Sequence, residues 1–453
     1  MTAGSCGHNG GRVRAYAQPA IARDVRPLAF IAQQRARLLV ALTVGGYIGV
    51  LHAIGGHAKW TKVGVPVIPF WFGDLRNVTS AWECVREHQA VLPANPCDPY
   101  HRPANYPRLW LLPSHLGLGQ GDTYWLGWVV AVIFFVAAVA VVPRGASLRL
   151  GLLYAAALIS AATMLGVERG NVDLLLFALV VLAVLVAGRT LSRLIGSGGL
   201  ILLAAMLKLF PILAVGFLFR RATRQAWAVG AAVLVAFAAY VLALHHQIHQ
   251  VVNAIPQADK YSFGLRRVTE WLSAATEGKN ASGASLPSWD VLVVLLVLAA
   301  AIFLVRRWRP RGTGGVDAGS QRDLDLFWAG ACVYVGCYVA GRSFDYRLVF
   351  CLLTVPQLAR WAAARSVLAY VSIVALLGTL WLDGWYDSIT IRNVLDGWSG
   401  WTNAGPNAQQ LPLSAIAQLI LFATFVAWLV ATVPSLSRLP LRRPARLRPA
   451  AST

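Results

Sequence analysis

Charged side chains that could take part in chemistry occur in four short segments of an otherwise apolar chain. The first contains Asp74, directly before a stretch in which apolar residues recur at helical spacing. An aspartate there can accept a backbone N–H as a helix N-cap, or it can act as a general base that takes a proton from a hydroxyl group. The two roles are compatible, and Asp98 and Glu168 are further candidates for the base.

Asp173 and Lys208 belong to the next two segments, where ionisable residues border or interrupt apolar runs. Asp173 ends the sequence Glu-Arg-Gly-Asn-Val-Asp at the start of an uncharged run, where a buried acid requires a partner or a substrate. The alternative is a solvated turn in which Glu168 and Arg169 neutralise each other. Lys208 precedes Pro211 within an apolar stretch, so it must either reach the membrane surface or meet an anion.

The fourth segment reads Gly-Arg-Ser-Phe-Asp-Tyr-Arg and lies between two apolar runs at 341–347. Its two arginines, Arg342 and Arg347, could bind a phosphate through paired hydrogen bonds. The alternative is that an arginine pairs with Asp345 and closes the turn. The sequence favours neither.

Two stretches outside the apolar runs, 55–122 and 245–289, hold most of the remaining polar and aromatic residues. Tyr100 and Tyr106 could stack on sugar rings or mark the membrane interface. His246 belongs to a group of histidines that is more typical of interfacial anchors than of a metal site. No His or Cys spacing resembles a zinc site, and we expect no metal ion and no other cofactor.

The stretch 55–122 also contains a predicted amphipathic helix and a predicted disulfide. Leu75, Val78, Trp82 and Val85 form an apolar stripe, which favours a helix lying in the plane of the membrane interface. Cys84 and Cys97 are expected to pair, because an oxidising outer compartment favours disulfide formation.

The composition shows what kind of scaffold must position these residues. The chain has 453 residues, of which 57% are hydrophobic and 13% are charged, and its mean hydropathy is +0.58. Too little polar surface remains to cover a water-soluble globule, so the sequence predicts an all-α polytopic membrane protein. Apolar runs long enough to cross a bilayer are predicted at 38–54, 123–143, 151–167, 172–188, 225–244, 290–305, 325–341, 346–359, 366–382 and 411–433.

A further apolar stretch, 198–219, has arginines on both sides and a Lys-Leu-Phe-Pro break in its middle. We interpret it as two half-length helices that enter the membrane and return to the same side, because a single crossing would violate the charge rule for membrane topology. The predicted crossings then place both termini on one side.

The net charge of +21 fits this topology without a nucleic-acid partner. If the basic tails 1–37 and 434–453 are cytoplasmic, the predicted cytoplasmic segments carry the whole net charge, which is the positive-inside pattern. The residues before the first apolar run are mostly polar, so that run is expected to be a retained anchor and not a cleaved leader. This pattern suits a bacterial inner membrane, with a transmembrane domain at 38–433 and its long loops on the outer face.

Five of these features together resemble a known enzyme class. They are the acid in the first outer loop, Asp-Pro-Tyr (98–100), Tyr-Pro (106–107), Arg-Gly-Asn-x-Asp (169–173) and Lys-Leu-Phe-Pro (208–211). In this order they are similar to the GT-C membrane glycosyltransferases, and most of all to glycosyltransferase family 87, over roughly residues 40 to 360. The usual Tyr-Pro-Pro of the family is replaced here by Tyr106-Pro107-Arg108.

The resemblance implies a GT-C-like bundle of about 10 to 12 transmembrane helices. It also implies inverting transfer of a sugar, with mannose as the best guess, from a polyprenyl monophosphate to a glycolipid or glycan acceptor. Asp74 would deprotonate the acceptor hydroxyl, and Lys208, Arg342 and Arg347 would neutralise the donor phosphate. Residues expected to contact substrate are Arg76, Asp98, Tyr100, Tyr106, Glu168, Arg169, Asn171, Asp173, His246, Lys260 and Tyr261.

Two other functions remain open at this stage. A ligase or polymerase of lipid-linked glycans would use a diphosphate-linked donor. A flippase or transporter would need polar sites reachable from both membrane faces, often in two related halves. The chain has no detectable repeat, and its candidate acids fall on the predicted outer side, which favours a glycosyltransferase.

Overall fold

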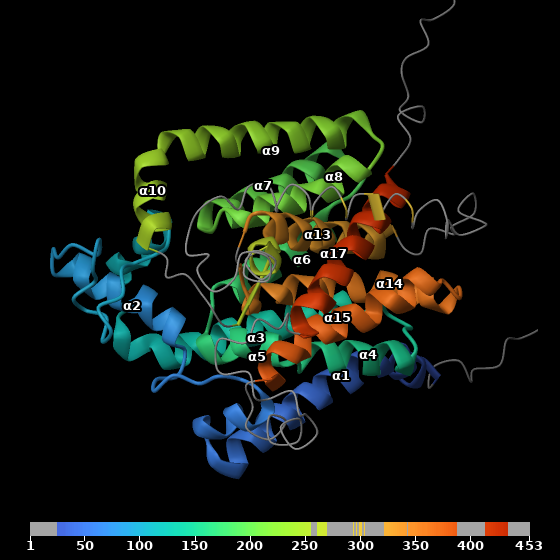
Figure 1. Ribbon diagram of the computed structural model, residues 1–453, viewed down its shortest axis with the longest axis horizontal. Helices are drawn as coiled ribbons and strands as arrows, with labels where there is room; N and C mark the ends of the chain where they lie inside the picture. The colour runs from blue at the N-terminus through green and yellow to red at the C-terminus, as the bar shows by residue number, and fades with distance from the viewer. Residues whose placement is uncertain are drawn as a thin grey trace, which may run out of the picture.

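The computed structural model describes residues 25–254, 261–269, 321–341, 343–386 and 413–433, with single positions between 293 and 303. Within these ranges the chain is mostly helical and forms a polytopic helical membrane protein (Figure 1). Five described helices are long and apolar enough to cross a membrane, or six if one bent pair counts as a single span. The predicted total of about 10 to 12 remains a prediction, since 290–305 lies mostly outside the described residues.

The N-terminal part consists of a bundle helix, the elements of the first outer loop and a second bundle helix. Its elements are α1 (Val25–Gly55), η2 (His57–Val63), α2 (Gly73–Arg86), η3 (Arg108–Leu116), η4 (Gln120–Asp122) and α3 (Thr123–Val141). The middle part contains α4 (Leu148–Leu158), α5 (Ala161–Arg169), α6 (Asp173–Val186), α7 (Leu191–Leu207), η5 (Phe210–Val215), α8 (Gly216–Arg220), α9 (Arg224–Ala243) and α10 (His245–Ala254). The C-terminal part contains β1 (Ser262–Phe263), α13 (Gln321–Val339), β2 (Ser343–Phe344), η7 (Asp345–Thr354), α14 (Val355–Ala363), α15 (Val367–Tyr386) and α17 (Leu413–Thr432).

Most of the predicted spans correspond to single helices, and two do not. The run 151–167 is divided into α4 and α5, and the chain bends by 54° between them. Ser160 starts α5 by accepting a hydrogen bond from the Thr163 backbone N–H, as an N-cap residue does. The run 346–359 begins as the 3-10 helix η7 and continues as α14, with Pro356 in the first turn of α14.

The stretch 198–219 forms a hairpin, as its flanking arginines suggested. Helix α7 ends at Leu207, Lys208 has an extended backbone, and the chain returns through η5 and α8. The guanidinium of Arg221 donates to the Gly188 carbonyl at 2.8 Å. The segment therefore leaves the bundle at the end where it entered, with Lys208 at the opposite tip.

Polar contacts gather at two ends of the bundle. At one end Arg37 donates to the Val142 carbonyl and Gly145 to the Gln33 carbonyl, so the start of α1 meets the end of α3. The end of α17 joins them through Thr432, which accepts from Trp328 near the start of α13. Segments predicted on the cytoplasmic side thus lie together, and α2 and α10 lie at the other end (Figure 1). Which end faces the cytoplasm remains a prediction.

Helix α2 differs from the interfacial helix that the sequence predicted. Three residues of its apolar stripe, Leu75, Val78 and Trp82, are buried, but so are the intervening Asn77, Thr79 and Ser80. The polar side chains find hydrogen-bond partners in the outer loop, for example Thr79 with Thr123 at 2.7 Å. The helix is therefore enclosed by protein and held in a fixed position.

Asp325 is the acidic anchor of the hairpin. Its two carboxylate oxygens accept from Arg220 at 2.8 Å and from Arg221 at 2.5 Å, and the carboxyl side chain is fully buried. We expect Asp325→Ala to destabilise the protein by about 3 to 5 kcal/mol, because two arginines lose a shared buried partner. The midpoint of thermal unfolding in detergent measures this loss, with the exposed Glu87→Ala as control. An unchanged midpoint would show that the pair does not anchor the hairpin.

Candidate active site

The outer loop places Asp74 in the first turn of α2. The helix is preceded by Phe72 as its N-cap, and no side chain caps it, so the interpretation of Asp74 as an N-cap is wrong. Phe72 adopts a left-handed backbone conformation with φ of 58°. A β-carbon on Gly127 would lie 2.2 Å from the Phe72 ring and one on Gly170 would lie 2.8 Å from its side chain, so two glycines make the space for Phe72.

Asn171 and Arg102 hold the Asp74 carboxylate. The Asn171 side-chain amide donates to Oδ2 at 2.6 Å, and the Arg102 guanidinium lies 4.0 Å from Oδ1. Asn171 follows Gly170, whose left-handed conformation ends α5 and turns the chain toward α2. The Asp74 side chain keeps 20% of its surface exposed, so it is held in place but accessible.

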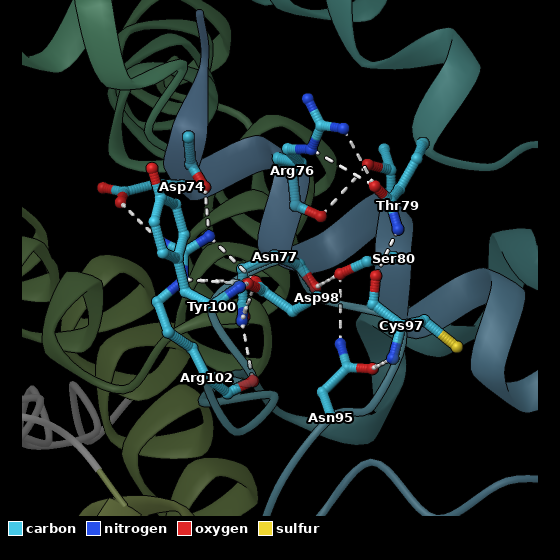
Figure 2. A network of polar contacts seen from close by, with 12 residues as sticks. Asp74, Arg76, Asn77, Thr79, Ser80, Asn95, Cys97, Asp98, Tyr100 and Arg102 are labelled. Carbon is cyan, nitrogen blue, oxygen red and sulfur yellow. Dashed lines mark hydrogen bonds and ion pairs between the residues drawn. The ribbon is translucent and has the colours of Figure 1, made fainter. Parts of the chain in front are cut away.

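Arg102 is the main contact between Asp74 and the rest of the loop (Figure 2). It donates to the Gly73 carbonyl at 2.7 Å and to the Asp98 carboxylate at 2.8 Å. Asp98 is fully buried and also accepts from the Asn77 amide and the Tyr100 backbone N–H. A carboxylate surrounded by donors and closed to solvent is badly placed to take a substrate proton, so this geometry favours Asp98 as a support for Arg102 over Asp98 as a reserve base.

Glu168 also has a supporting position. Its carboxylate is fully buried, with His57 Nε2 at 2.7 Å, Arg169 Nε at 3.1 Å and the Ile68 backbone N–H at 3.3 Å. Its backbone carbonyl accepts from the Phe72 N–H at 3.0 Å. Burial, together with the positive charge of Arg169, lowers the pKa of His57, which favours the neutral imidazole. Glu168 therefore fastens the segment before α2 to the end of α5.

The Asp173 carboxylate forms ion pairs with two cationic side chains. Lys208 Nζ lies 2.6 Å from Oδ1, and Arg347 Nε lies 3.7 Å from Oδ2. Lys208 also lies over the rings of Tyr106 and Tyr346, at 5.6 Å and 5.4 Å from their centroids. Because one carboxylate serves two cations, the group carries a net positive charge.

A pocket of about 340 Å³ opens beside Asp74. Its polar lining comes from the first outer loop, the end of α5, the residue before β1 and the start of η7, and consists of Asp74, Asn77, Arg102, Asn105, Tyr106, Arg169, Tyr261 and Tyr346. Tyr261 reaches it because β1 pairs antiparallel with β2 in the register Ser262 to Phe344. Burial and the Asp74 carboxylate raise the pKa of Tyr106 well above its usual value, which keeps its hydroxyl neutral and makes it a donor.

Other candidates from the sequence lie away from the pocket lining. Arg76 donates to Gln120 and lies over Phe70, whereas Tyr100 is an exposed neighbour of Phe70. His246 contacts Gln250 within α10. Arg342 and Lys260 lie outside the described residues.

Cys84 and Cys97 form a disulfide in the structure, with their Cα atoms 5.7 Å apart. The bond joins α2 to the segment that carries Asp98. Sequence reasoning missed Arg102 and Tyr346 as lining residues. Arg102 lies in an irregular part of the outer loop, so no helical spacing in the sequence pointed to its pairing with Asp98. Within the described ranges, no group of three or more His, Cys, Asp or Glu side chains is placed to hold a metal ion.

Removing the Glu168 carboxylate should release the segment before α2. We expect Glu168→Ala to destabilise this region by about 2 kcal/mol, because the Ile68 N–H and the His57 ring lose a buried acceptor. Trypsin should then cut faster after Lys59, which is half-buried in η2, and after Lys62, which is exposed there. Cleavage rates by mass spectrometry test this, with Glu87→Ala as control. Equal rates in the two variants would contradict the supporting role.

The sequence model of glycosyltransferase family 87 matches residues 109–320, a shorter region than the motifs suggested. The match includes Glu168, Asn171, Asp173 and Lys208, and Asp74 precedes it. No curated protein and no solved structure gives a match. The family is one of GT-C membrane enzymes that use lipid-linked sugars, and the chain has the helical, multi-pass architecture of that class. The protein therefore contains a glycosyltransferase family 87 domain and is a multi-pass membrane glycosyltransferase with a lipid-linked sugar donor.

Proposed function

We propose that the protein transfers a sugar, with mannose as the best candidate, from a polyprenyl monophosphate to a glycolipid or glycan acceptor. The reaction takes place at the outer face of the bacterial cytoplasmic membrane, with both termini in the cytoplasm. The supporting observation is that Asp74 is the one acidic side chain among the described residues that line the pocket. It lies there between a neutral amide donor and an arginine.

Asp74 is the general base in this proposal. The acceptor hydroxyl oxygen attacks C1 of the sugar from the face opposite the phosphate, and the bond between C1 and the phosphate oxygen breaks. The hydroxyl proton passes to Asp74, and the polyprenyl phosphate leaves with the electron pair. Asn171 occupies Oδ2, which leaves Oδ1 to receive the acceptor hydroxyl.

The two cationic side chains beside Asp173 can neutralise the negative charge of the leaving phosphate. Lys208 and Arg347 share one carboxylate, so the group has one positive charge available for a monophosphate ester. Tyr106 and Tyr346 lie next to Lys208 and also line the pocket, so their hydroxyl groups are further hydrogen-bond donors for the substrate. This arrangement stabilises negative charge as it develops on the leaving group.

A transporter is less well supported by the same geometry. Transport requires a site that both membrane faces can reach. At the opposite end of the bundle, the buried Asp325 is paired with Arg220 and Arg221, and the buried Asp323 is paired with Arg360. The pocket lies at the end that holds the two outer loops.

Asp74→Asn tests the assignment of the base. We expect transfer from radiolabelled polyprenyl-phosphate mannose to fall by about 100-fold to 10,000-fold, because the amide cannot accept the hydroxyl proton. The measurement is labelled product formed by membranes that contain equal amounts of folded protein. Glu87→Gln removes an exposed acid from the same loop and should leave the rate unchanged.

The results of this assay separate the parts of the proposal. Undiminished transfer by Asp74→Asn would overturn the role of the base, while the reaction class would stand. No product from the wild-type protein with mannose, and none with an arabinose-linked lipid, would overturn the donor class.

Lys208→Gln tests the phosphate site. It leaves Asp173 with Arg347 alone and removes the net positive charge. We expect the KM for the lipid-linked donor to rise about 10-fold to 100-fold, since a charge-assisted contact is lost, while the KM for the acceptor changes little. Lys62→Gln, at an exposed position of η2, is the matched control. A rise in the acceptor KM alone would place Lys208 elsewhere in the mechanism.

A further inference from the structure

The break in the hairpin leaves backbone carbonyls without their usual helical partners. In a continuous helix the Leu207 carbonyl would accept from the N–H of residue 211, but that residue is Pro211 and has no N–H. The backbone leaves the helix at Lys208, so the Met206 carbonyl also loses its partner. Such carbonyls are costly in an apolar surrounding unless another donor reaches them.

Two aromatic side chains supply the missing donors. The indole N–H of Trp110 donates to the Leu207 carbonyl at 2.9 Å, and the hydroxyl of Tyr240 donates to the Met206 carbonyl at 2.9 Å. Trp110 belongs to η3 of the first outer loop, and Tyr240 belongs to α9. The tip of the hairpin, with Lys208 next in the chain, is therefore held from two sides.

Trp110 also connects this tip to the helix that carries Asp74. Its carbonyl accepts a hydrogen bond from the indole N–H of Trp82. Trp82 lies eight residues after Asp74 on α2, about two turns further along the helix. The Trp110 ring also packs against Tyr106, at 6.0 Å between centroids, and Tyr106 lies over Lys208.

We propose that Trp110 and Tyr240 are positioning residues for the lipid phosphate, with Trp110 setting the separation between Lys208 and Asp74. The inference rests on the proposed function, in which Lys208 faces the donor phosphate. Neither aromatic residue touches the substrate. They fix the carbonyls beside Lys208, so the ammonium group meets Asp173 and the phosphate in a single geometry.

Trp110→Phe removes the indole N–H and keeps an aromatic ring. We expect the Kd for undecaprenyl phosphate, measured on protein in lipid nanodiscs, to rise about fivefold, as expected for the loss of one buried hydrogen bond. Tyr240→Phe removes the second donor and should also raise the Kd. Trp125→Phe is the matched control, since Trp125 donates only to Asp122 one turn earlier and its ring is half exposed.

A double-mutant cycle separates positioning from general packing. If both residues act through Lys208, their effects on the Kd disappear when they are combined with Lys208→Gln. A purely structural role would give the same fold-change in both backgrounds and a lower midpoint of thermal unfolding.

The outcomes distinguish this inference from the proposed function. An unchanged Kd in folded Trp110→Phe and Tyr240→Phe, or an effect that persists in the Lys208→Gln background, overturns the positioning role. If Trp110→Phe does not fold, Tyr240→Phe decides the question by the same cycle. No binding of undecaprenyl phosphate and no sugar transfer by the wild-type protein overturn the proposed function and this inference together.

Discussion

The site depends on the compensation of one buried carboxylate, that of Asp173. An acid that begins an uncharged helix is stable only with cations beside it, and here they come from distant parts of the sequence. Lys208 requires the break in the hairpin, and Arg347 requires the sharp turn between α13 and η7. Two separate departures from regular helix therefore meet at the start of α6. The irregular backbone is tolerated because protein surrounds it.

A second set of buried acids holds the outer loop in position next to the Asp173 group. Asp98 fixes Arg102, and Glu168 fixes the segment that leads into α2. Both acids are fully buried and held by several donors or cations, whereas Asp74 has one short hydrogen bond and an exposed edge. The contrast between buried and accessible carboxylates is a physical basis for dividing the acids of this region into supports and a reactive group.

The sequence predicted the membrane class, most helices and the hairpin, because hydropathy, flanking arginines and Pro211 are local signals. It also showed that Asp173 and Lys208 each need a partner, but it could not show that they partner each other across 35 positions. The role of Phe72 as N-cap was invisible, since its left-handed backbone depends on space made by distant glycines. Arg102 was missed because its importance comes from Gly73 and Asp74, which are brought to it by folding. Local chemistry was predictable, and long-range geometry was not.

The space occupied by Phe72 extends the active site to residues without functional groups. Gly127 lies in α3 and lines no part of the pocket, but a methyl group there would collide with the Phe72 ring and displace the start of α2. In a random mutagenesis screen for loss of sugar transfer, a conservative glycine-to-alanine change within a membrane helix would then score like a change at the base itself. Activity therefore depends on the lack of a side chain at Gly127 as well as on the carboxylate of Asp74.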